Sequence, residues 1–297
     1  MDNRLLQGVF PPIPTPFDAS GAVDHEALKR NLKWWNRHEL SGYVALGSNG
    51  ESVHLTEPEK LRVIADVRAK APDDHLIIAG TGLLSTQATI ALTEQAAEVG
   101  ADAALVLPPF YYRGQMTSDV LVEHFRAIAD ASSIPIVLYN MPGNTGIDMA
   151  AHLVIELSRH ENIVGIKDSA GNIVKLSEIR HSADTGFSVL AGSAGFFLPA
   201  LAVGADGGVL GLANIAPSIC IEIFSAARRG AWDEARALQN KVVRANSAVT
   251  RQWGVPALKA AMDLLGLAGG PPRPPLLPLS DERRSELSDI LTDAGIL

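Results

Sequence analysis

The feature of this sequence that most limits its fold is a regular alternation of short apolar runs with longer amphipathic runs. Eight of the short runs are rich in Val, Ile and Leu and are apolar on both faces, as parallel strands covered on both sides are. These strand candidates are residues 8–14, 42–46, 76–79, 103–107, 134–139, 163–167, 188–191 and 207–211. Helix patterns lie between them, for example at 58–70, 85–99 and 119–129, and several begin at capping residues.

Eight strand–helix units favour a closed barrel. They occupy residues 8–229 at roughly 28 residues each, and eight parallel strands are the number that closes a (β/α)8 barrel. A doubly wound sheet is the alternative, but it usually carries a glycine-rich turn after its first strand, where this chain has Pro12, Pro14 and Pro16. We therefore predict an α/β fold, a (β/α)8 TIM barrel that contains the active site.

The C-terminal part of the chain has a different pattern. Residues 231–250, 256–267 and 280–293 read as helices, and the pattern shows no further strand candidate. The proline-rich stretch 269–278 reads as a rigid linker between two of these helices. We expect the barrel to span residues 1–229 and a helical extension, packed on the barrel, to span residues 230–297.

Composition excludes several classes of function. Asp and Glu number 33 against 25 Lys and Arg, so the net charge of −8 argues against nucleic-acid binding. The single cysteine, Cys220, excludes an internal disulfide and a cysteine-based zinc site, and we expect it to be buried. No metal-binding or nucleotide-binding motif is present, so we expect neither a metal nor a cofactor. Residues 1–7 are charged and 196–216 are interrupted by polar residues, which predicts a cytoplasmic protein without a membrane span.

In a barrel of this kind, chemistry gathers where strands end. Lys167 closes an apolar strand, where burial would lower the pKa of a lysine and allow its neutral amine to form a Schiff base. The alternative is a structural lysine paired with Asp168. The turn at 47–51 offers small residues and free N–H groups that suit a carboxylate or phosphate, although it could be a plain glycine-rich turn. Tyr139 could exchange protons or only fill the barrel.

Taken together, these residues resemble the dihydrodipicolinate synthase / N-acetylneuraminate lyase family of class I aldolases, from Gly8 to about Leu279. The likeness rests on three motifs in order: residues 47–51, residues 139–142 followed by Thr145-Gly146, and residues 165–169. It implies a barrel with a helical C-terminal part that acts on a small 2-keto acid without a cofactor. It also implies a homotetramer built as a dimer of dimers.

The resemblance also assigns roles to residues of this chain. Lys167 would be the Schiff-base lysine and Tyr139 the proton-shuttling tyrosine, with Ser48 in a relay and Tyr111 lent across the dimer interface. The substrate-binding residues would be Ser48, Asn49, Gly50, Asn144, Ser169, Gly192, Ser193 and Val209.

Departures from the synthase pattern point to one branch of the family. Synthase members usually carry two threonines at Ser48-Asn49 and an arginine at Asn144, and their lysine-feedback positions fall on Leu84, Ala88 and Phe110 here. A closer likeness is to 4-hydroxy-2-oxoglutarate aldolase, through residues 48–51, 144–146, 190–196 and 248–251. We expect cleavage of 4-hydroxy-2-oxoglutarate to pyruvate and glyoxylate. The alternatives are a synthase-like or 2-keto-3-deoxy sugar acid aldolase with the same lysine, and a non-catalytic keto-acid binding protein.

Overall fold

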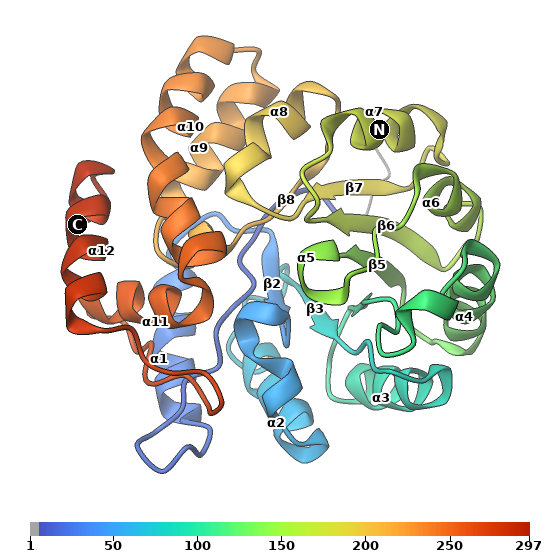
Figure 1. Cartoon of the computed structure of the whole chain (residues 1–297), viewed down its shortest axis with the longest axis horizontal. Helices are drawn as coiled ribbons and strands as arrows, with labels where there is room; N and C mark the ends of the chain where they lie inside the picture. Colours follow the sequence, from blue (N-terminus) through green and yellow to red (C-terminus); the bar gives the residue numbers. More distant parts are fainter. Residues whose placement is uncertain (1–5) are drawn as a thin grey trace.

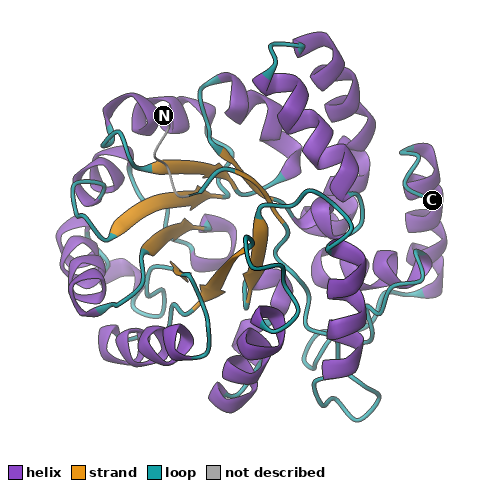
Figure 2. Ribbon diagram, turned by 180° about the vertical axis from the view of Figure 1, so that it is seen from behind, coloured by secondary structure: helices purple, strands orange, loops and turns teal. Residues whose placement is uncertain are grey.

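Eight parallel strands form the centre of the computed structural model, which describes residues 6–297. The strands are β1 (Gly8–Phe10), β2 (Gly42–Ala45), β3 (Leu76–Gly80), β4 (Ala103–Val106), β5 (Ile136–Asn140), β6 (Ile163–Asp168), β7 (Ser188–Ala191) and β8 (Gly207–Val209). Their order is β1-β8-β7-β6-β5-β4-β3-β2, and β1 pairs with β8. Helices surround the strands in Figure 2, so the predicted barrel is confirmed over the doubly wound sheet. The first five residues of the charged N-terminal stretch lie outside the described part.

The first strand is shorter than predicted, and this leaves a seam between β1 and β2. The run 8–14 pairs as a strand only at its first three residues, because Pro11 and Pro12 have no N–H to donate to a ladder. The seam is closed by the Val44 N–H, which donates to Pro11 O at 3.0 Å, and by the Ile13 N–H, which donates to Val44 O at 3.0 Å. The Pro11 carbonyl accepts one of these bonds and the Val44 carbonyl accepts the other, so the two strands stay joined beyond the end of the β1 ladder.

Each strand is followed by helical structure that covers the outside of the barrel (Figure 1). These helices are α1 (His25–Trp35), α2 (Glu57–Arg68), α3 (Thr86–Glu98), α4 (Ser118–Ala131), α6 (Ala151–Leu157), α7 (Ile173–Ser182), α8 (Phe197–Ala202) and α9 (Pro217–Arg228). The short α5 (Pro142–Thr145) follows β5 and lies in the middle of the view in Figure 1, inside the outer ring of helices. The predicted caps are present: the Ser85 side chain accepts from Ala88 N, and Thr56 forms a capping box with Glu59. Within residues 6–297, every helix is too short or too polar to span a bilayer.

The core has two layers because successive residues of a strand point to opposite faces. Inside the barrel, Phe10, Val44, Val137, Leu190 and Val209 belong to one buried cluster. A larger cluster lies between the strands and the helices. Cys220 is fully buried in this outer layer, as predicted, and burial raises the pKa of its thiol to about 12.

Beyond residue 230 the chain forms α10 (Trp232–Ser247), α11 (Gly254–Leu264) and α12 (Asp281–Asp293), with a π-helical turn at Ala248–Gln252. Figure 1 shows these helices along one side of the barrel, with α10 beside α9. The proline-rich stretch does more than link two helices, because the Arg273 guanidinium donates to Glu59 Oε1 at 2.7 Å and to Gly21 O at 2.7 Å. This loop is therefore fastened to the barrel.

Candidate active site

Lys167 and Tyr139 lie side by side at the carboxyl ends of β6 and β5. The two residues are partners in the parallel ladder, and their exposed fractions are only 3% and 4%. The Lys167 Nζ lies 4.0 Å from the centroid of the Tyr139 ring. The apolar strands thus bring a buried amine and a buried phenol together at the barrel end where chemistry was predicted.

Hydrogen bonds to the Tyr139 hydroxyl tune its acidity. Ser48 Oγ lies 3.3 Å from the Tyr139 hydroxyl oxygen, and Ser169 and Lys167 also bond to it. Burial raises the pKa of Tyr139, but the charge of Lys167 and these hydrogen bonds together outweigh burial and hold the pKa below 10.0. The phenol is therefore better prepared to give up its proton than a free tyrosine.

The segment after β2 begins with a 3-10 turn, Ser48–Gly50, which a second 3-10 turn, Ser52–His54, follows. The Gly50 N–H donates to Gly47 O at 2.9 Å, and the Thr15 hydroxyl donates to Gly50 O at 2.7 Å. Asn49 lies against Gly211, where a Cβ would come within 2.9 Å of the Asn49 Nδ2. The absence of a side chain at position 211 therefore makes room for the Asn49 amide.

The ends of β6 and β7 meet closely at Gly192. Its N–H donates to Asp168 O at 2.7 Å, and a Cβ on Gly192 would lie 2.0 Å from Ser169 Oγ. Only glycine permits this approach. The Ser193 hydroxyl accepts from Asn246 Nδ2 at 3.1 Å, so α10 contacts this end of the barrel as well. Val209 is buried in the same interior cluster as Tyr139.

Two predicted site residues lie apart from the buried group in the single chain. Asn144 is exposed on α5, and the Tyr111 side chain is 72% exposed in the loop after β4. The Tyr111 ring packs edge-on against Tyr112, with ring centroids 5.0 Å apart. In the structure Lys167, Ser48 and Ser169 thus lie in contact with Tyr139. Asn144 and Tyr111 lie at the surface.

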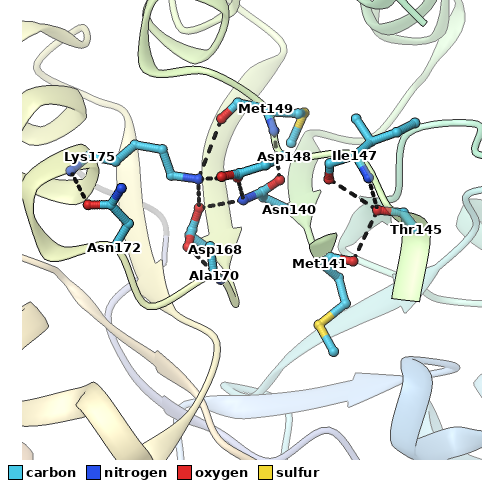
Figure 3. A network of polar contacts seen from close by, with 10 residues as sticks. All are labelled: Asn140, Met141, Thr145, Ile147, Asp148, Met149, Asp168, Ala170, Asn172 and Lys175. Atoms are coloured by element: carbon cyan, nitrogen blue, oxygen red, sulfur yellow. Dashed lines mark hydrogen bonds and ion pairs between the residues drawn. The ribbon is translucent and has the colours of Figure 1, made fainter. Parts of the chain in front are cut away.

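A polar network, drawn in Figure 3, lies on the other face of the same two strands. Asp168 is fully buried, and its Oδ2 accepts from Lys175 Nζ at 2.8 Å and from Asn140 Nδ2 at 2.7 Å. Asp148 accepts from the same two groups at 2.5 and 2.8 Å. The ion pair with Asp168, which was the alternative role for Lys167, is thus made by Lys175. The ladder pair Asn140 and Asp168, which follows the pair Tyr139 and Lys167 along the two strands, is thus held in place on the opposite face.

Sequence reasoning missed Lys175, although one signal was available. It lies in the first turn of α7 with the N-cap Asn172 accepting from its N–H at 3.1 Å, and its side chain is only 8% exposed. A cation is unfavourable near a helix N-terminus, so a buried lysine there indicates a dedicated anionic partner. Among residues 6–297, no three His, Cys, Asp or Glu side chains are grouped so that they could hold a metal ion.

Comparison with known proteins places this barrel in a family. A model of the dihydrodipicolinate synthetase family matches residues 5–294. The 4-hydroxy-tetrahydrodipicolinate synthase of Methanothrix thermoacetophila is 39% identical over 97% of this chain and 97% of its own length. The enzyme of the same name from Methanosarcina mazei is 36% identical over 99% of this chain and 100% of its own.

Solved structures agree with these relatives. A dihydrodipicolinate synthase from Bacillus anthracis matches with a TM-score of 0.93 and 32% identity, covering 97% of this chain and 98% of its own. One from Acinetobacter baumannii, complexed with pyruvate, matches with a TM-score of 0.93 and 34% identity, covering 98% and 99%. These relatives are named synthases and not 4-hydroxy-2-oxoglutarate aldolases, so they support the expected family but not the expected branch. The chain belongs to the dihydrodipicolinate synthetase family, whose members are class I, pyruvate-dependent lyases.

Proposed function

We propose that this enzyme binds a 2-keto acid as a Schiff base on Lys167. The observation that carries the proposal is the buried Lys167 Nζ placed 4.0 Å from the Tyr139 ring centroid at the carboxyl ends of neighbouring strands. A buried amine can attack the C2 carbonyl, and loss of water then gives an iminium that accepts an electron pair from the adjacent carbon. The turn Ser48–Gly50 holds the C1 carboxylate and so orients the carbonyl toward the amine.

Tyr139 moves the protons of the reaction in this proposal. In the cleavage direction its phenolate takes the proton of the C4 hydroxyl, the C3–C4 bond breaks, and the electron pair enters the iminium to give an enamine. The enamine is protonated at C3, and water releases pyruvate from Lys167. Ser48 bonds to the Tyr139 hydroxyl and can pass protons to it. In the condensing direction the same enamine attacks an aldehyde.

The second substrate has two candidates. The names of the relatives support a synthase-type condensation of pyruvate with an aldehyde better than cleavage of 4-hydroxy-2-oxoglutarate. One observation favours the cleavage: Asn144 presents a neutral, exposed amide where synthase members usually carry an arginine. An amide cannot replace the two-pronged contact of a guanidinium with a carboxylate.

Borohydride trapping tests the shared chemistry. Pyruvate with borohydride should add a reduced pyruvyl group to Lys167, detected by intact mass and peptide mapping, because only an imine is reducible under these conditions. An unmodified Lys167, under conditions that trap a known class I aldolase, overturns the proposal. An adduct without turnover of any substrate would indicate a keto-acid binding protein instead.

Comparison of kcat/KM distinguishes the candidates. The assays are cleavage of 4-hydroxy-2-oxoglutarate, cleavage of a 2-keto-3-deoxy sugar acid, and condensation of pyruvate with aspartate semialdehyde. If the neutral Asn144 sets specificity, 4-hydroxy-2-oxoglutarate exceeds the sugar acid by at least about tenfold, which is roughly 1.4 kcal/mol of transition-state preference. Faster condensation with the semialdehyde assigns the enzyme to the synthase type.

The exposed aromatic loop supports a proposed homotetramer, built as a dimer of dimers in which Tyr111 reaches a neighbouring site. Tyr111, Tyr112 and Leu84 are 72%, 66% and 51% exposed, and they line a groove of about 970 Å³. Exposed apolar side chains gathered in this way mark an association surface. Activity and light scattering, followed together on dilution, test the proposal, and a fully active monomer contradicts it.

A further inference from the structure

Residues of the C-terminal extension bind Glu51, the residue that directly follows the turn Ser48–Gly50. Glu51 is 2% exposed, and its backbone has a positive φ of 53°, which is uncommon for a residue other than glycine. Its Oε1 lies 2.6 Å from Lys259 Nζ on α11, and both side chains are 1% exposed. Its Oε2 accepts from the Arg273 backbone N–H at 2.9 Å. The first residue after Ser48–Gly50 is thus bound twice by the C-terminal extension.

The partners of Glu51 are themselves fixed. Lys259 Nζ also donates to Pro271 O at 3.0 Å and lies 4.3 Å from the centroid of the Phe17 ring. Burial lowers the pKa of Lys259, and its contact with Glu51 offsets only part of this effect. Because a buried ammonium is unfavourable without a counter-charge, the pair depends on both members.

Arg273 fastens the segment that follows the turn. Its side chain donates to His54 O at 2.8 Å and to Glu59 Oε2 at 2.9 Å. His54 Nδ1 lies 3.3 Å from Glu51 Oε2. The Glu51 carboxylate therefore contacts both the segment that follows the turn and the C-terminal extension. A residue held in the left-handed region persists there only where its surroundings determine it. The contacts of Glu51 with Lys259, Arg273 and His54 hold its backbone in this conformation.

We propose that Lys259 and Arg273 are positioning residues for the keto-acid site, and that they act through Glu51 on the turn Ser48–Gly50. This inference rests on the proposed role of that turn in holding the substrate carboxylate. The C-terminal extension then contributes to the binding site through Glu51.

The test uses the double variant Glu51→Gln/Lys259→Met, which removes both charges and leaves neither buried alone. The pyruvate concentration that gives half-maximal borohydride trapping on Lys167 should rise about tenfold or more, because small displacements of positioning groups have effects of this order. The maximal amount of adduct should be unchanged. Arg273→Met keeps the buried Glu51–Lys259 pair and removes the guanidinium contacts to His54 O and Glu59. It should give a smaller rise, which covers the case of a double variant that folds poorly.

Arg68→Met is the matched control. Arg68 NH1 lies 3.3 Å from Asp102 Oδ2, just before β4 and therefore at the opposite end of the barrel. Its loss should lower the melting temperature without changing the half-saturating pyruvate concentration. If the half-saturating pyruvate concentration of Arg68→Met rises as much as that of the double variant, the effect is general destabilisation and the positioning role is overturned.

Amide hydrogen exchange separates this inference from the proposed function. The N–H groups of Gly50 and Glu51 donate to Gly47 O and Ser48 O at 2.9 and 3.2 Å, and they should exchange faster in the double variant but not in Arg68→Met. Half-saturation within twofold of wild type, or unchanged exchange of these amides, overturns the positioning role. A wild type that forms no adduct overturns the proposed function, and the exchange experiment then still decides whether the extension positions the turn.

Discussion

Replacement of Lys175 by Met examines how the strand pair that carries Lys167 and Tyr139 is stabilised. Methionine keeps most of the apolar stem of the side chain and removes the ammonium that lies 2.8 Å from Asp168 Oδ2. Asp168 has no exposed surface, and it would keep its bonds from Asn140 Nδ2 and from the Ala170 N–H at 2.7 and 2.8 Å. It would lose the only charge that the described ion pairs place against it.

The size of the effect follows from this burial. Removing one member of a buried ion pair costs about 3–5 kcal/mol because the other charge is left uncompensated. Unfolding entropy of about 2.1 cal/mol/K per residue gives roughly 0.6 kcal/mol/K for this chain. The melting temperature of Lys175→Met should therefore fall by about 5–8 °C.

Thermal and urea unfolding measure this loss, and two controls define its cause. The double variant Asp168→Asn/Lys175→Met should recover most of the stability, because neither charge is then buried alone. Arg244→Met removes the cation of a solvent-exposed pair with Asp293, whose two side chains are 73% and 69% exposed, and should leave the melting temperature nearly unchanged. A fall of less than about 2 °C in Lys175→Met, or no recovery in the double variant, refutes the reasoning.

Three further variants test other groups. Tyr139→Phe should still form the Lys167 adduct but lower kcat by about 10²–10⁴, and a kcat within about threefold of wild type would leave Tyr139 a packing role. Burial lowers the pKa of His124 to about 4, so stability should decline as the pH falls from about 6.5 toward 4, where only the unfolded chain takes up the proton. His124→Gln should flatten that decline in urea unfolding at several pH values, and an unchanged slope contradicts the assignment. The Arg273 guanidinium, together with the hydrogen bonds of Thr56, lowers the pKa of Glu59 from 4.5 to about 2, so this carboxylate stabilises the fold above pH 4.5 and loses that effect as the pH falls toward 2. In Arg273→Ala, an NMR titration should find the Glu59 pKa clearly above 2, because the largest cause of its lowering is lost while the hydrogen bonds of Thr56 remain, and a value still near 2 would exclude Arg273 as the main cause.

The barrel and the positions of Lys167 and Tyr139 could be predicted from the sequence because both depend on local patterns. A strand covered on both faces must be an apolar run, and Lys167 and Tyr139 end two such runs. The end of β1 was placed too late because the run stays apolar through prolines that cannot pair.

The supporting contacts could not be predicted in the same way. Asp168 follows Lys167 in the sequence, but its partner Lys175 is on a helix, and alternation in the strand turns Asp168 away from the barrel interior. Glu51 and Lys259 pair across the fold, and nothing in the spacing of charged residues says which of them become buried. Such contacts depend on how the extension packs, which is a tertiary property.

The bond between the Arg273 N–H and Glu51 has a consequence for how the protein is made, because it joins residues 222 positions apart. Ribosomes add about 5–20 residues per second, so about 10–45 s separate the synthesis of the two ends of this bond. Within that interval Tyr139 and Lys167 join the turn in the nascent chain, and the residues that fasten the turn follow only later. A product that terminates between Val209 and Lys259 contains every residue proposed for the site and leaves the turn untethered.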